Sequence, residues 1–510
     1  MFLTSGRWAA RIGMALLAVV TAPSFAAGQT PLTATEAFGP RISPALTAAA
    51  VVNPPRRSNA TIDTVRYWNQ VSIDASGLDH TPVAPGENRV FGEALGPGRS
   101  ARAVAIVHIA MFDAVNGITG GFRSYTGIAR ETRPASLDAA IATAAHDTLV
   151  QMFPSQASNF HSLYNADIAR IPPAQEQQKN LGVVIGQRAA ALILGRRVND
   201  GSEIPEPRVG IQWITSNAAG RWRQDPISLT PLALGAHWGS VDPFVMTSAS
   251  QFRAPPPPAL SSAAYTAAFN EVKRLGGDGV NTPTERSADQ TRAGIYWAYD
   301  GTPSLCAPPR LYNQITTELT KTMTSIVGLA RIYALVNTSM ADAAIAGWES
   351  KYFYDFWRPI GGVREADPGT GPSRTGDGNP ATIGDVNFFP LGAPASNLRG
   401  PNFTPPFPAY PSGHATLGGA LFEMLRNILG TDNVPFTFVS DEFNGQTVDN
   451  NGNVRPLLPR SFTTLSQAEE ENGQSRIYLG IHWAFDKTEG IRQGRRIADF
   501  VFANAFQPVN

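Results

Sequence analysis

Apolar side chains recur every three or four residues over long stretches of this chain, whereas the two-residue alternation of a half-buried strand is scarce. One apolar stripe runs from Val104 to Val115. Another runs from Leu137 to Met152, where Ser136 is a candidate cap of the helix N-terminus. This spacing predicts a mainly α fold. Further helices are expected over residues 181–196, 262–275, 285–299, 310–350, 414–430 and 490–505.

Proline and glycine, with 41 and 47 residues respectively, gather between these helical stretches. The run Pro255–Pro258 predicts a connector between an N-terminal helical half, residues 27–258, and a C-terminal helical half, residues 259–510. Residues 366–410 are expected to form a long loop that ends at the Ser-Gly-His turn. The stretch between Asn433 and Ser461, with runs such as DNNGN, is expected as surface loop.

The first 26 residues have the order of charged and apolar groups found in secretory signal peptides. Arg7 and Arg11 precede an apolar run from Met14 to Thr21, and Ser24-Phe25-Ala26 offers a cleavage site with small residues. The apolar run is too short to span a membrane comfortably. We therefore expect a signal peptide over residues 1–26, cleaved from a secreted or periplasmic protein.

The charges of the chain balance, with 41 basic and 41 acidic residues and no basic run. Nucleic-acid binding is therefore not expected, because clustered positive charge recognises the phosphate backbone. After the leader no uncharged apolar stretch of 18 or more residues is found, so stable membrane insertion is not expected either. Cys306 is the only cysteine, which excludes an intrachain disulfide. The sequence leaves the oligomeric state open.

A first candidate site segment reads WESKYFYDFWRPIGG. If a helix continues through it, Trp348, Lys351 and Arg358 lie along one face, and Pro359 ends or kinks that helix directly after Arg358. A guanidinium at a helix end can bind two oxygens of an anion, and the lysine adds a point charge. The alternative is a solvated basic pair on an amphipathic helix.

A second segment, PPFPAYPSGHATLGGALFEMLRNIL, changes from a proline-rich approach to helical spacing at Ser412-Gly413. These two residues are expected at a helix N-terminus, where free backbone N–H groups and the helix dipole favour an anion. His414 follows in the first turn, where it can exchange protons with a bound oxygen. The alternative is that Pro-Ser-Gly is only a loop and a helix cap.

The third segment, SRIYLGIHWAFD, supplies Arg476 as a further cation. His482 and Asp486 are four residues apart, so the carboxylate could orient the imidazole as it does around metal ligands and nucleophiles. Gly480 is expected to break the helix between Arg476 and His482. A lone pair of this kind is otherwise more often structural. Together the three segments predict a pocket for a tetrahedral oxyanion.

The ordered pattern K-x6-R-P, P-S-G-H and S-R-x5-H-x3-D resembles the superfamily of vanadium-dependent haloperoxidases and type 2 phosphatidic acid phosphatases. The segments FWRPIGGVR, PPFPAYPSGHATLGGALF and SRIYLGIHWAFD are most similar to the chloroperoxidase branch, and the resemblance runs from about residue 60 to the C-terminus. It implies an architecture of two four-helix bundles, with the site in the second bundle.

The resemblance also implies a role for each matching residue. His482 would coordinate vanadium through an imidazole nitrogen, with Asp486 as its outer partner. The residues that would hydrogen-bond the vanadate oxygens are Lys351, Arg358, Ser412, Gly413 and Arg476. His414 would be the acid–base residue, with Lys351 and Asp300 also catalytic and Asp300 paired with Arg476. Trp348 and Phe407 would line the halide side, and a phenylalanine at position 407 favours chloride competence besides bromide.

The expected activity is oxidation of halide by hydrogen peroxide to hypohalous acid, which then halogenates an organic acceptor. Vanadate would be the cofactor, without haem or flavin. A soluble acid phosphatase is the alternative, because the same pocket could bind phosphate with His482 as nucleophile and His414 protonating the leaving group. The third possibility is an oxyanion-binding module without catalysis, which His414 argues against because binding alone needs no acid–base residue.

Overall fold

The computed structural model describes residues 32–44 and 58–509. The predicted signal peptide and its cleavage site at Ala26 lie outside these ranges. The described residues belong to one compact unit that begins at Leu32. The boundary predicted between residues 258 and 259 stays a prediction.

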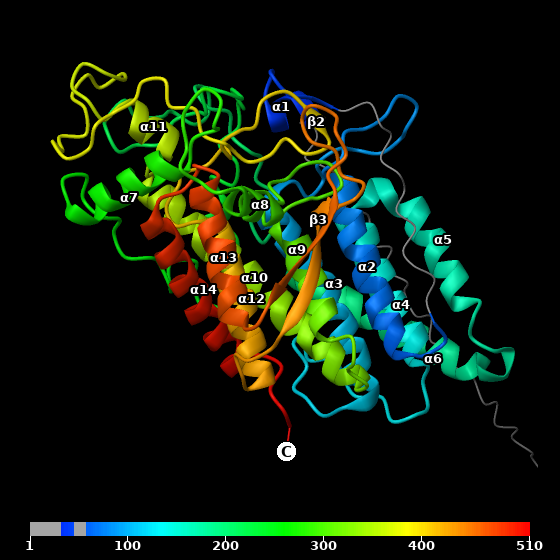
Figure 1. The fold of residues 1–510 in the computed structure, drawn as a ribbon. Coiled ribbons are helices and arrows are strands. Elements are labelled where there is room, and N and C mark those ends of the chain that lie inside the picture. The colour runs from blue at the N-terminus through cyan, green and yellow to red at the C-terminus, as the bar shows by residue number, and fades with distance from the viewer. Residues whose placement is uncertain (1–31, 45–57, 510) are drawn as a thin grey trace, which may run out of the picture. The chain divides into compact units, whose positions relative to one another are not determined.

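Over the described residues the fold is mainly α, as the helical spacing predicted, with long helices side by side and two small sheets (Figure 1). The helices are α1 (Ala34–Phe38), α2 (Ile62–Asp79), α3 (Gly96–Thr119), α4 (Leu137–Met152), α5 (Ala157–Ile168), α6 (Glu176–Arg196), α7 (Ala263–Leu275), α8 (Ala288–Tyr296), α9 (Pro308–Leu319), α10 (Ile326–Tyr354), α11 (Pro359–Arg364), α12 (Gly413–Leu429), α13 (Leu465–Tyr478) and α14 (Ala484–Asn504). The sheets are the antiparallel pairs β1 (Ser43–Pro44) with β2 (Leu398–Arg399) and β3 (Phe436–Asn444) with β4 (Leu457–Phe462).

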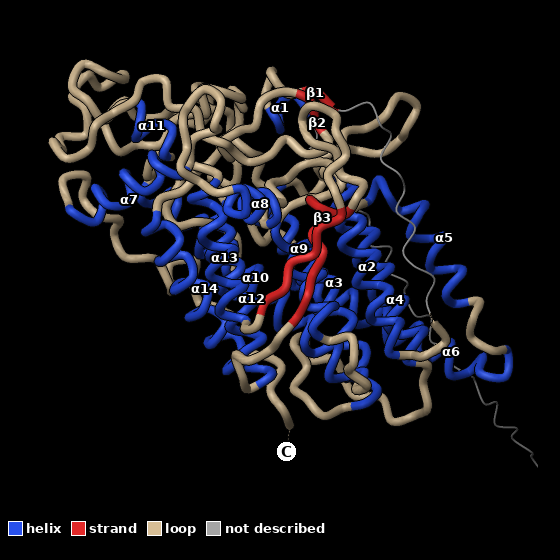
Figure 2. Tube along the Cα trace, in the orientation of Figure 1, coloured by secondary structure: helices blue, strands red, loops and turns tan. Residues whose placement is uncertain are grey.

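Two helices, α3 and α10, pack against each other at the centre of the core. Within the described ranges, α3 is the one helix long and apolar enough to cross a membrane by composition, and 89% of its apolar window is buried inside the protein. Such burial is expected of a core helix, because an element that is apolar all round must be covered by its neighbours. Figure 2 shows most of the long loops gathered at one end of these helices, and the site lies there.

Helices α12 and α14 approach each other closely through glycines. A Cβ atom at Gly494 would lie 2.1 Å from the carbonyl oxygen of Thr416 and 2.6 Å from the backbone nitrogen of Ala420. Because both atoms belong to the backbone, the helices would have to move apart to admit a methyl group. The glycine at this position therefore lets α14 lie against the helix that carries His414.

We expect Gly494→Ala to lower the free energy of unfolding by about 2–3 kcal/mol, as overpacking in a tight core does. The measurement is equilibrium unfolding in denaturant. Gly195→Ala is the matched control, because a Cβ there meets no atom within 4 Å. In α6 that substitution should stabilise the protein by a few tenths to about 1 kcal/mol. Equal unfolding midpoints for Gly494→Ala and the wild type would contradict the close approach.

The helix expected over residues 310–350 is in fact two helices, α9 and α10, and α10 ends at Tyr354 rather than at Arg358. Asp355 caps α10 in the left-handed conformation, with φ of 52°. Arg358 is the N-cap of α11, and Pro359 is its first residue. The prediction that Pro359 ends a helix was therefore wrong. Proline is also favoured at the first helical position, where its missing N–H costs nothing.

The stretch between Asn433 and Ser461, expected as surface loop, contains β3 and most of β4. Alternate residues of β3 are buried, among them Phe436 and Phe438, which is the period-two pattern of a strand packed on one face. The polar run after Val448 forms the irregular connection between the two strands. Helices α1, α2, α5 and α11 were also missed, and of α13 only its end before Gly480 was expected. Residues 366–410 form a long loop as expected, with β2 as a two-residue strand inside it.

Candidate active site

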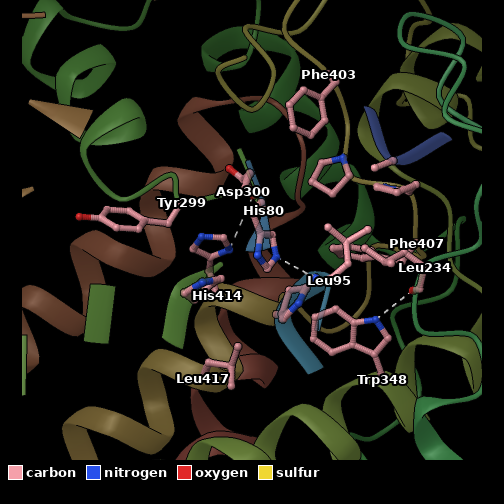
Figure 3. A pocket seen from close by; sticks show the side chains of 18 of the residues that line it. His80, Leu95, Leu234, Tyr299, Asp300, Trp348, Phe403, Phe407, His414 and Leu417 are labelled. Carbon is pink, nitrogen blue, oxygen red and sulfur yellow. Dashed lines mark hydrogen bonds and ion pairs between the residues drawn. The ribbon is translucent and has the colours of Figure 1, made fainter. Parts of the chain in front are cut away.

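A chamber opens among the loops, next to the C-terminal part of α10 and the N-terminus of α12 (Figure 3). It contains about 680 Å³ of space free of atoms, part of it open to solvent. The predicted site residues that line it are Asp300, Trp348, Phe407, Gly413, His414, Arg476 and His482. Lys351, Arg358, Ser412 and Asp486 lie behind these residues and contact them. The fold thus brings together all three segments that the sequence singled out.

The two arginines of the site keep part of their hydrogen-bonding capacity unused. Arg358 donates through Nε to the Phe407 carbonyl, and through Nη1 to the Ile481 carbonyl and to His482 Nε2, at 2.8–2.9 Å. Its Nη2 has no partner, although the side chain is buried. Arg476 donates through Nη2 to both oxygens of Asp300, at 2.6 and 2.8 Å, so the predicted ion pair is present.

Arg476 Nε and Nη1 are also buried without a partner. A buried N–H group that is not hydrogen-bonded is costly, more so when it carries charge, so such groups call for an acceptor. An anion in the chamber would satisfy them.

Lys351 was expected to bind the oxyanion, but in the structure it binds backbone carbonyls. Its Nζ donates to three backbone carbonyls, those of Pro408, Ala409 and Pro411. An ammonium group has three protons, so all of its donors are occupied in this arrangement. Burial, and then the neighbouring Arg358, hold the pKa of Lys351 well below its usual value. The lysine therefore fixes the segment that leads into α12, and any direct bond to an anion would replace one of these carbonyls.

The N-terminus of α12 faces the chamber with the geometry that the sequence predicted. Ser412 is the N-cap, and its hydroxyl oxygen accepts a hydrogen bond from the Ala415 N–H, which leaves the hydroxyl proton able to donate. Gly413 is the first helical residue, and the first N–H groups of a helix have no partner within it. A Cβ at Gly413 would lie 3.0 Å from the ring of Trp348, so the glycine keeps this corner open.

His414 is held in one tautomer by its surroundings. Its Nε2 contacts the carbonyl oxygen of Ala298 and must donate to it, which leaves the lone pair on Nδ1. That nitrogen lies 4.0 Å from an oxygen of Asp300. Burial, and then the charge of Arg476, hold the pKa of His414 well below its usual value. The imidazole is therefore neutral and can accept a proton at Nδ1.

His482 lies just before α14, where Trp483 is the N-cap. Its Nδ1 donates to Asp486 at 2.8 Å, which leaves the lone pair on Nε2, and that nitrogen accepts the hydrogen bond from Arg358 Nη1 at 2.8 Å. The same carboxylate oxygen accepts from the Trp483 N–H at 3.0 Å. Gly480, with φ of 71°, makes the turn after α13, as expected, and a Cβ there would collide with the Gly276 carbonyl. The helix break, the turn and the carboxylate together orient the imidazole.

Trp348 and Phe407 form one aromatic wall, with ring centroids 5.0 Å apart. The indole N–H of Trp348 donates to the Leu234 carbonyl at 3.1 Å, so it is already engaged and the ring offers only its faces and edges (Figure 3). Lys351 Nζ lies 5.1 Å from the centre of the Phe407 ring and 5.5 Å from that of Trp348. The amino group of Lys351 therefore lies directly behind the wall.

His80 also lines the chamber, although it was not among the predicted site residues. It is fully buried at the C-terminal end of α2, where its Nδ1 donates to the Ser76 carbonyl and its Nε2 accepts from the Gly96 N–H, each at 2.9 Å. Both nitrogens are satisfied, so its role is to hold the turn that begins α3. No local sequence signal marks it, because the contact that matters joins α2 to α3.

The arrangement suits an oxyanion better than a bare metal ion. In residues 32–44 and 58–509 no group of three or more His, Cys, Asp or Glu side chains could hold a metal ion. Vanadate brings its own oxygens, so it needs one nitrogen ligand and several donors. Those donors are present as the unpartnered N–H groups of Arg358 and Arg476. His482 Nε2 carries a lone pair that now accepts from Arg358 Nη1, and binding to vanadium would replace that hydrogen bond. These residues therefore fit vanadate, and they would equally fit phosphate.

Comparisons with known proteins agree on one family. The model of the VCPO second helical-bundle domain matches residues 331–510. The vanadium chloroperoxidase of Curvularia inaequalis is 30% identical to this chain, over 83% of this chain and 78% of that protein. Among solved structures, a bacterial vanadium-dependent iodoperoxidase aligns with a TM-score of 0.66 at 22% identity, over 87% of this chain and 97% of that one. A bacterial vanadium-dependent chloroperoxidase in its holo form aligns with a TM-score of 0.61 at 18% identity, over 86% and 96% of the two chains. At these identities the two structures establish the fold.

Proposed function

We propose that this chain, which belongs to the family of vanadium-dependent haloperoxidase enzymes, binds vanadate at His482 and uses hydrogen peroxide to oxidise halide to hypohalous acid. The observation that carries the proposal is the set of buried, unpartnered guanidinium N–H groups of Arg358 and Arg476 beside His482 Nε2. A site built only for stability would not leave three charged donors without acceptors.

In this proposal His482 Nε2 binds the vanadium and Asp486 keeps the proton on Nδ1. The guanidinium groups, the hydroxyl of Ser412 and the backbone N–H of Gly413 bind the oxygens and withdraw charge from them. Bound vanadate supplies Lewis-acid activation of peroxide towards halide without a change of vanadium oxidation state, so neither haem nor flavin is needed. His414 Nδ1 takes the proton from the incoming peroxide.

Halide would approach along the wall of Trp348 and Phe407. The rings exclude water from the halide, and the amino group of Lys351 lies behind them. Phe407 favours chloride as well as bromide in this proposal. The order of reactivity expected from the redox chemistry is iodide, then bromide, then chloride.

The test uses the purified protein after bound anions have been removed. Orthovanadate, hydrogen peroxide and bromide are added, then chloride in a parallel arm, and halogenation of a β-diketone dye is followed. We expect activity only with vanadate and competition by phosphate, which needs the same donors. If no halogenation occurs and the protein instead hydrolyses an aryl phosphate in a vanadate-inhibited reaction, the site is that of a phosphatase and the proposal is wrong.

Asp486→Ala should weaken vanadate binding by about 10–100-fold, because the carboxylate that fixes the His482 tautomer is lost. Equilibrium dialysis of vanadate measures the change without relying on turnover. Asp499→Ala is the control, since that exposed carboxylate lies on the same helix and contacts only Asn427. Equal affinity in the two variants would show that Asp486 does not position the ligand.

We also propose that the protein is exported. The support is the leader over residues 1–26, with its two arginines, apolar run and small-residue cleavage site. Mass spectrometry of the N-terminus of protein recovered outside the cytoplasm tests it, and a mature chain that begins at Ala27 is the expected result. An intact leader on protein retained in the cytoplasm would overturn it.

A further inference from the structure

The chamber has two ends of different chemistry. Asp300, His414, Arg476 and His482 form one end of the chamber. The other end is walled by Phe38, Leu95, Leu234 and Phe403 together with prolines. In Figure 3 Leu95, Leu234 and Phe403 lie to the right of Asp300 and His414. The space of about 680 Å³ includes the open mouth of the chamber, so a molecule bound at the apolar end would remain partly exposed to solvent.

Part of the apolar end comes from the first described segment of the chain, Leu32–Pro44, which we name the N-terminal strap. Ala37 and Phe38 of the strap line the chamber. The strap is fixed at several points. Thr230 Oγ1 donates to the Phe38 carbonyl at 3.1 Å, Glu36 forms an ion pair with Arg208, and the last two residues of the strap pair with β2. The strap is therefore a built part of the wall.

The strap also packs on the segments that carry the site. Phe38 and Ile42 belong to one small apolar cluster with Leu95, Phe403 and Ile481. Ile481 directly precedes His482, and Phe403 lies four residues before Phe407. The apolar wall and the oxyanion cradle are thus built on the same buried cluster, which fixes their relative positions.

We infer that the apolar end of the chamber binds an uncharged organic halogen acceptor with an aromatic ring or an alkene, and that Phe38 of the strap is part of its binding wall. The inference rests on the proposed function. Halide and peroxide gain nothing from an apolar wall, whereas an apolar molecule is bound by the area it removes from water. The apolar end lies beside His414 and His482, so a molecule bound there is next to the place where the oxidised halogen is formed.

The chemistry balances without a further reagent. In an aromatic acceptor the π electrons form the carbon–halogen bond as the halogen–oxygen bond of hypohalous acid breaks, and the proton lost from carbon joins the departing hydroxide as water. The overall reaction is then R–H + X⁻ + H₂O₂ + H⁺ → R–X + 2 H₂O. An alkene forms the same carbon–halogen bond and takes the hydroxide on its second carbon. A bound acceptor would be halogenated before hypohalous acid diffuses away, so the protein would choose between acceptors.

A competition experiment tests this choice. The vanadate-loaded protein is given peroxide, bromide and an equimolar mixture of 2-naphthol and a water-soluble β-diketone, and the ratio of brominated products is compared with that from reagent hypobromous acid. We expect the protein to favour the naphthol by about fivefold or more over the reagent, an effect that partial burial of one apolar ring suffices to produce. The ratio does not depend on the amount of active enzyme.

Phe38→Ser should move the ratio to that of the reagent, because it removes part of the wall. Ala37→Trp should do the same by filling the chamber, and it removes no buried ring. Phe160→Ala, which deletes a buried phenylalanine of α5 away from the chamber, should keep the wild-type ratio. The inference is overturned if the wild-type protein gives the same product ratio as reagent hypobromous acid. It is also overturned if the wild-type ratio differs from that of the reagent but Phe38→Ser and Ala37→Trp keep the wild-type ratio. Triiodide formation from iodide needs no organic acceptor. Measuring it therefore tests the proposed halide oxidation separately from the proposed acceptor site.

Discussion

His482→Ala is expected to abolish vanadate-dependent halogenation. The variant removes the one nitrogen that would bond to vanadium and leaves only hydrogen-bond donors around it. Removing a residue that only hydrogen-bonds a metal ligand weakens binding by about 10–100-fold. Removing the ligand itself should therefore weaken vanadate binding by more than about 100-fold. Equilibrium dialysis of vanadate and the halogenation assay should fall together.

The fold should survive this change. Arg358 Nη1 loses His482 Nε2 as an acceptor but keeps the Ile481 carbonyl, and Asp486 keeps the Trp483 N–H. His161→Ala is the matched control, because that imidazole is exposed and contacts only His146. If His482→Ala binds vanadate as tightly as the wild type, the ligand has been assigned to the wrong residue.

The sequence predicted the site better than the elements that carry it. Ser412-Gly413 could be placed at a helix N-terminus because the change from proline-rich to helical spacing is local. Gly480 and the spacing of His482 and Asp486 were likewise readable, since a break and a four-residue interval need no tertiary information. The roles of these residues stay predictions until they are measured.

Other features depend on contacts that local patterns do not encode. Arg358 was expected at the end of α10 but caps α11, because Pro359 is compatible with either position. Lys351 was expected to bind the anion, yet its protons go to three carbonyls of a segment more than fifty residues away. Phe38 and His80 reach the chamber from the N-terminal part of the chain through packing alone.

His414→Ala is expected to separate binding from turnover. The imidazole is fixed by the Ala298 carbonyl and presents a neutral Nδ1. It is not among the groups that carry positive charge for the anion, so vanadate binding should change little. The halogenation rate constant kcat should fall by about 10²–10⁴-fold, the usual contribution of a positioned acid–base group.

A purely structural role for His414 predicts a different set of results. A collapsed α12 N-terminus would displace Gly413 and weaken vanadate binding and turnover alike. If the histidine moves a proton instead, imidazole in the buffer should restore part of kcat in His414→Ala, because a small base can enter the space left by the side chain. An unchanged kcat in the variant would exclude His414 as the proton acceptor and leave the charged donors as the whole of the catalytic apparatus.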